Sequence, residues 1–195
     1  MDTAMSLLRS AFPWIFFTAL ASTSWKTAAI AAAVSSLVIV VQKRRAGTGW
    51  EDLILDVGTL LYFVLVAAIA SVSPHSSLQP YSGAGSHAFL GLVAWFSIAV
   101  RKPFTMAFAK RSTPKEIWAE PRFLKVNMTI STFWASMFII TAPLIALAYH
   151  ATHKGLDATL VQLIGMAVAG FLTVRYAAHA RAKAAAPAAG NSAAA

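Results

Sequence analysis

The sequence predicts an all-α membrane protein, a single bundle of about six transmembrane helices. Hydrophobic residues make up 58% of the 195-residue chain and charged residues only 12%, whereas a typical soluble domain carries ~25% charged residues. Apolar runs alternate along the chain with short polar or charged segments. Too few polar side chains are left to cover a water-facing surface, so much of the surface is expected to face lipid.

The apolar runs cover residues 7–23, 27–41, 53–72, 86–100, 126–149 and 158–176. They are continuous rather than alternating, which favours helices over the strands of a membrane barrel. Several are shorter than the ~20 residues that a perpendicular helix needs, so the helix boundaries are expected to differ or the bilayer to be thinned locally. Residues 1–183 are assigned to one transmembrane domain. The Ala-rich residues 184–195 are expected to form a disordered tail or to fray from the last helix.

Basic residues are shared unequally between the two sides of a six-span bundle. One side receives every Lys and Arg except Lys26 and Lys154. The positive-inside rule makes that side cytoplasmic and places both termini in the cytoplasm. A five-span arrangement would bury Lys26 within the membrane, so six spans are preferred. The net charge of +9 indicates anionic lipid headgroups rather than nucleic acid, because the basic residues lie in short clusters between apolar runs.

The longest expected cytoplasmic loop, residues 101–125, is the candidate working surface. Pro103 disfavours the helical conformation at Lys102, which predicts a sharp turn after the fourth run. Phe104 and Phe108 are spaced as on one face of a helix, so a short helix in the headgroup layer is expected. The candidate interaction or lipid-facing residues are Arg101, Lys102, Pro103, Phe104, Phe108, Trp118, Asn127 and Trp134.

Asp56 lies about one turn inside the third run, where an acid is costly and often functional. The favoured interpretation is structural: Asp56 reaches towards the cytoplasmic interface, or pairs with Arg175 at the same depth. Asn127 and the hydroxyl side chains of the fifth run likewise favour contacts between helices. The alternative is a small transporter or channel, in which Asp56 and these hydroxyls line a polar path.

The residues that could support chemistry are few. His150 and His153 could present two imidazoles on one helical face, but a zinc site would need further ligands, such as His75 or His87. The chain contains no cysteine. No nucleophile with a plausible base, no carboxylate pair and no phosphate loop can be recognised in the sequence. We therefore expect no enzymatic activity, no metal and no cofactor.

Several motifs follow one another in a characteristic order. Phe12-Pro13-Trp14 precedes an Ala-rich stretch at residues 25–33 and the basic Lys43-Arg44-Arg45; then come Arg101-Lys102-Pro103-Phe104, Pro114-Lys115-Glu116-Ile117-Trp118, Asn127 and Trp134-Ala135. This order resembles that of the intracellular septation protein A family, small inner-membrane proteins of bacteria. The chain would be a divergent member, because residues 119–123 are additional. The resemblance implies a multi-pass protein of the bacterial inner membrane. It also implies a role in cell envelope maintenance and septation during cell division, through contacts with other membrane proteins.

Overall fold

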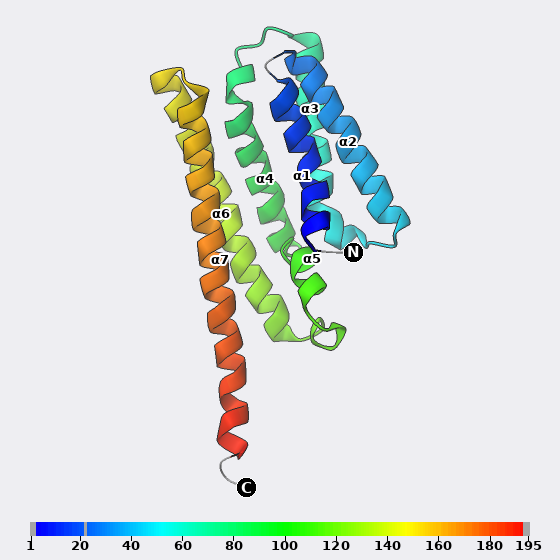
Figure 1. The fold of residues 1–195 in the computed structure, drawn as a ribbon, viewed down its shortest axis with the longest axis vertical. Coiled ribbons are helices and arrows are strands. Elements are labelled where there is room, and N and C mark those ends of the chain that lie inside the picture. The colour runs from blue at the N-terminus through cyan, green and yellow to red at the C-terminus, as the bar shows by residue number, and fades with distance from the viewer. Residues whose placement is uncertain (1–2, 22, 193–195) are drawn as a thin grey trace.

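The computed structural model describes residues 3–21 and 23–192, and this part of the chain is helical without strands. Its long helices coincide with the apolar runs of the sequence (Figure 1). They are α1 (Thr3–Leu20), α2 (Trp25–Arg45), α3 (Ile54–Val72), α4 (Ser82–Ala99), α6 (Pro121–Thr152) and α7 (Gly155–Ser192). The connections contain the short helix α5 (Met106–Ala109) and the 3-10 turns η1 (Trp50–Leu53), η2 (Gln79–Tyr81), η3 (Lys110–Ser112) and η4 (Lys115–Ile117).

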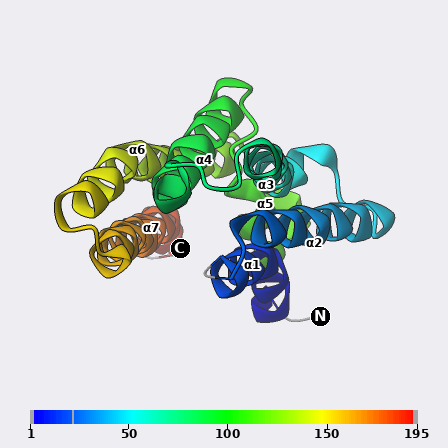
Figure 2. The ribbon, with the colours of Figure 1, turned by 90° about the horizontal axis from the view of Figure 1, so that it is seen from above.

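Successive long helices run in opposite directions and pack against each other. α1 packs on α2, α2 on α3, α3 on α4, α4 on α6 and α6 on α7. Seen from above, these helices form a curved row with α1 and α7 at its two ends (Figure 2). The start of α1 and the end of α7 lie at the same end of the bundle as α5 (Figure 1). We call this the α5 end.

The long helices carry an apolar surface that is compatible with a membrane location. Among the described residues, 4 helical segments are long and apolar enough to cross a membrane: Trp25–Arg45, Trp50–Val72, Pro121–Thr152 and Gly155–Lys183. Large hydrophobic side chains point outward from them, including Val34, Leu61, Ile140 and Phe171, which are exposed. In water such a surface would be strongly unfavourable, whereas lipid chains cover it without cost.

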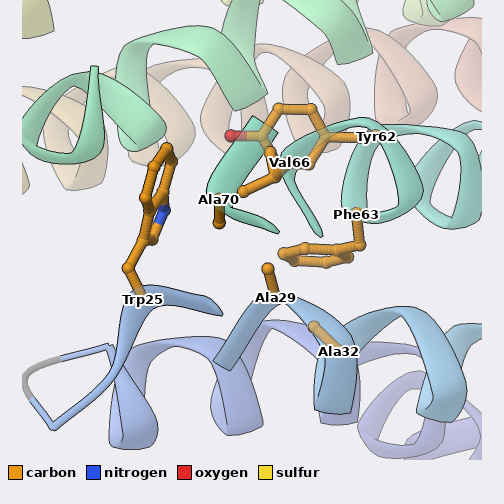
Figure 3. Close-up of a cluster of buried hydrophobic side chains, with 7 residues drawn as sticks. All are labelled: Trp25, Ala29, Ala32, Tyr62, Phe63, Val66 and Ala70. Atoms are coloured by element: carbon orange, nitrogen blue, oxygen red, sulfur yellow. The ribbon is translucent and has the colours of Figure 1, made fainter. Parts of the chain in front are cut away.

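Small side chains of α2 allow α3 to approach closely. Ala29 and Ala32 are fully buried, and the ring of Phe63 lies over them (Figure 3). Phe63 also contacts the indole of Trp14 in α1, with ring centroids 4.7 Å apart. The Ala-rich second run therefore acts as a flat surface onto which aromatic side chains of α3 pack.

The helix boundaries extend beyond the apolar runs. α6 begins at Pro121, inside the expected loop, because proline at the first helical position has no N–H to leave unsatisfied. α7 continues to Ser192, through most of the stretch for which the sequence predicts a disordered or fraying tail. Alanine has the highest helix propensity, so an Ala-rich stretch that follows a formed helix continues it readily. Residues 193–195 lie outside the described residues.

Candidate functional site

The chain turns sharply at the α5 end, where α4 stops. Arg101 adopts a left-handed backbone conformation, with φ at 56°. Its N–H donates to the carbonyl of Ile98, and the N–H of Lys102 donates to the carbonyl of Ser97, both at 2.9 Å. This pair of bonds is the Schellman motif, which satisfies the last carbonyls of a helix. The turn expected before Pro103 is therefore present, and the backbone of Arg101 makes it, while the side chains of Arg101 and Lys102 are exposed.

The residues that follow the turn pack inward. Pro103 is fully buried, and Phe104 is only 6% exposed, between Ala94 of α4 and Ala135 of α6. Neither residue faces lipid or an external partner, in contrast to the expectation from the sequence. The reason is the turn itself, because it directs the chain back under α4 and α6 instead of along the bilayer surface.

Thr105 joins this turn to α6 by hydrogen bonds. Its hydroxyl lies 3.0 Å from the backbone oxygen of Asn127 and 2.9 Å from the hydroxyl of Ser131. Asn127 is 2% exposed, and its side-chain amide donates to the carbonyl of Phe123 at 2.9 Å. Asn127 is therefore an interior contact rather than part of the accessible surface.

Asp56 pairs with Lys43, not with Arg175. The Nζ atom of Lys43 lies 2.7 and 2.8 Å from the two carboxylate oxygens of Asp56 and 3.0 Å from the hydroxyl of Ser10. One cation thus joins α1, α2 and α3. The pairing with Arg175 is wrong because α7 packs against α6, and α4 and α6 separate it from α3.

A second ion pair connects the 3-10 turns at the α5 end. Lys110 of η3 lies 2.8 Å from a carboxylate oxygen of Asp52 in η1. Its Nζ atom is also 5.5 Å from the centroid of the Trp118 ring, within the range of a cation–π contact. The indole N–H of Trp118 donates to the carbonyl of Thr113 at 3.0 Å. Trp118 is consequently fixed in place and half-buried.

Two adjoining hollows lie among these charged side chains. A cavity of about 80 Å³ lies beside Ser10, Trp14, Asp56 and Phe104. A wider groove of about 520 Å³ lies between the last turns of α2, residues 46–49, and the α5–η3 segment. We call it the α2–α5 groove. The two hollows share the lining residues Lys43, Asp52, Ala107 and Arg111.

The remaining candidate residues are distributed between the surface and the helix contacts. Phe108 is half-buried, and the guanidinium of Arg111 lies 5.4 Å from the centroid of its ring. The indole N–H of Trp134 donates to the hydroxyl of Thr173 at 3.0 Å, which joins α6 to α7. Of the predicted set, Arg101 and Lys102 are thus the side chains that remain exposed at the α5 end.

The histidines do not gather into a ligand set. The rings of His150 and His153 are 6.3 Å apart. Within residues 3–21 and 23–192, no group of three or more His, Cys, Asp or Glu side chains could hold a metal ion. His87, considered above as a further zinc ligand, is buried in α4, with its Nδ1 atom 3.2 Å from the carbonyl of Gly83 and its ring against Phe138.

Sequence reasoning missed both ion-pair partners and Thr105. A signal for the first pair was available: Lys43 lies near the end of α2 and Asp56 near the start of α3, so an antiparallel hairpin brings them to one depth. No comparable signal identifies Asp52 as the partner of Lys110 or Thr105 as the partner of Asn127. Those contacts depend on how the loop folds back under the bundle.

No family model, no curated protein and no solved structure matches this chain. The resemblance to the septation protein A family therefore rests on the ordered motifs of the sequence alone.

Proposed function

We propose that this chain is a six-span protein of the bacterial inner membrane, with both termini in the cytoplasm. It acts without catalysis, in cell envelope maintenance or septation, through contacts with other membrane proteins. The family resemblance supports the division role, and the arrangement of the helices and charges supports a contact function.

Two helices add to the 4 segments that length and composition identify as candidate spans. α1 and α4 are 18 residues long each. Phe12 and Phe16 of α1, and Leu92 and Phe96 of α4, are exposed and need an apolar environment. An 18-residue helix is about 27 Å long, close to the ~30 Å thickness of the hydrocarbon core.

The charge distribution supports the orientation. All Lys and Arg residues except Lys26 and Lys154 fall towards the α5 end in a six-span arrangement. The positive-inside rule assigns the cytoplasm to that end. The start of α1 and the end of α7 lie at that end as well, which supports a cytoplasmic location for both termini.

The observation that carries the contact function is that the partly buried lysines and aspartates at the α5 end are paired with each other. Lys43 binds Asp56, and Lys110 binds Asp52. A pathway for ions or protons would instead present its charged groups to a water-filled route. Here the first pair joins α2 to α3 and the second joins η3 to η1, whereas the side chains of Arg101 and Lys102 remain exposed.

Site-specific photo-cross-linking in cells tests this function. A photoreactive residue at Lys102 is expected to capture a small, reproducible set of division or envelope membrane proteins. The matched control is Leu163, exposed on the lipid-facing surface of α7. Equal capture at both positions, or capture unaffected by Arg101→Glu at normal protein abundance, would exclude a specific contact surface at the α5 end.

One observation favours the transporter or channel as a second candidate. The cavity of about 80 Å³ brings Asp56, Ser10 and Thr59 together and is large enough for water. Purified protein in liposomes distinguishes the two functions. Cation or proton flux that Asp56→Asn abolishes would establish transport and displace the contact function as the primary activity.

A further inference from the structure

We propose that the α2–α5 groove binds the phosphate of an anionic phospholipid headgroup, with an acyl chain lying along the exposed face of α2. This inference deepens the proposed function and rests on it for the bilayer setting. It does not depend on the division role or on the identity of any protein partner.

The groove and the adjoining cavity have an excess of positive charge. Their cations are Lys43, Lys110 and Arg111, and their carboxylates are Asp52 and Asp56. Each lysine is paired with one carboxylate. Within residues 3–21 and 23–192, Arg111 has no carboxylate within ion-pair distance. Its charge is therefore available to an anion that enters the groove.

The surroundings of Arg111 suit a phosphate group. A guanidinium donates two parallel hydrogen bonds to phosphate oxygens, which an ammonium cannot do. The guanidinium carbon of Arg111 lies over the ring of Phe108, 5.4 Å from the ring centroid, and Arg111 lines the groove. Gln42 and Thr48 line the same groove and add neutral donors for the remaining oxygens. Its volume of about 520 Å³ lies within the 300–1,000 Å³ typical of small-ligand sites.

The position of the groove favours a lipid over a soluble phosphate. Trp50 beside it is 61% exposed, with the guanidinium of Arg44 4.5 Å from its ring centroid. Exposed indoles with basic neighbours are typical of the headgroup layer. Val38 lies one helical turn from Gln42 on α2, and Val38 and Val34 are both exposed. A lipid whose phosphate meets Arg111 can therefore lay an acyl chain on this apolar face of α2.

Thermal unfolding of the purified full-length protein in detergent micelles tests the proposal. The added probes are phosphatidylglycerol, zwitterionic phosphatidylethanolamine and inorganic phosphate. Phosphatidylglycerol is expected to raise the melting temperature, and the other two are not. Arg111→Gln should weaken the apparent affinity for phosphatidylglycerol about fivefold, the contribution of one cation at an anionic lipid surface. Arg111 is exposed, so this variant should fold.

Two further variants sharpen the test. Arg181→Gln removes the same charge from an exposed position of α7, a helix that does not line the groove, and should bind phosphatidylglycerol as the unmodified protein does. Val38→Ser should weaken phosphatidylglycerol binding, because it removes apolar contact with the acyl chain.

Three results would overturn the proposal. The first is that Arg111→Gln and Arg181→Gln lose the same affinity for phosphatidylglycerol. The second and third are that phosphatidylethanolamine, or inorganic phosphate, raises the melting temperature as much as phosphatidylglycerol does. The last would assign the groove to a soluble anion. None of these results affects the cross-linking experiment, so a failure of the lipid site can be separated from a failure of the contact function.

Discussion

Removing either partner of the Lys43–Asp56 pair should destabilise the bundle. The charged atoms are 2.7 Å apart, and at an effective dielectric constant of about 20 their attraction is about 6 kcal/mol. The side chains are only 18% and 14% exposed, so desolvation offsets much of this attraction. Loss of one partner leaves the other charge uncompensated. We therefore expect Lys43→Met or Asp56→Asn to lower the free energy of unfolding by about 3 kcal/mol.

A double-mutant cycle separates the pair from other effects of the substitutions. The free energy of unfolding is measured in mixed micelles with increasing denaturing detergent, by tryptophan fluorescence. Trp14 lines the cavity beside Asp56 and reports on this region. The double variant Lys43→Met/Asp56→Asn should recover part of the loss, with a coupling energy of at least about 1.5 kcal/mol. Arg175→Met removes an exposed cation and should change the free energy by no more than about 0.5 kcal/mol.

The reasoning would be refuted by strict additivity of the two single substitutions. It would also be refuted if Lys43→Met cost no more than Arg175→Met. Either result would mean that Lys43 and Asp56 are separately solvated in the folded protein and do not join α2 to α3.

Three further predictions test other parts of the structure. Arg101→Gly should raise the free energy of unfolding by about 1 kcal/mol, because glycine adopts the left-handed conformation without the steric cost that arginine carries; the same micelle titration measures it, and a loss of stability would contradict the Schellman turn. Gly165→Ala should lower stability by about 1–3 kcal/mol, since its methyl group would overlap the Thr141 side chain, whereas Gly170→Ala meets open space and should be neutral or stabilising. A reporter enzyme that is active only outside the cytoplasm should be active when fused after Ser77; an inactive fusion at normal abundance would overturn the six-span orientation.

The sequence predicts the helices well because helix formation depends on the residues within each segment. In an apolar run that enters lipid, the backbone has to form its hydrogen bonds within the same segment, so the helical state follows without knowledge of neighbouring segments. The ends of the helices depend on finer features. Pro121 starts α6 earlier than hydropathy indicates, and the left-handed conformation of Arg101 ends α4 at a residue type that rarely adopts it.

The candidate site is predicted less well from the sequence, because its contacts depend on the tertiary structure. Phe104 is apolar and Asn127 is polar, yet both side chains are buried at the contact between the loop and α6. Their environment is created by the turn at Arg101, which brings Thr105 within hydrogen-bond distance of α6. Composition indicates that the loop is basic and aromatic, but only the fold decides which of its side chains remain accessible.

The basic clusters at the α5 end therefore contain two kinds of cation. Lys43 and Lys110 pair with carboxylates, whereas Arg101 and Lys102 remain exposed. The positive-inside rule weights both kinds alike, because it counts charges and not contacts. The free energy of unfolding depends on Lys43 and Lys110, because removing either lysine leaves a partly buried carboxylate without its partner. A neutral residue at Lys43 should lower the free energy of unfolding, and one at Lys102 should not. Both variants keep enough flanking cations to preserve the orientation, so any loss of partner contact at Lys102 can be read as an effect on the surface itself.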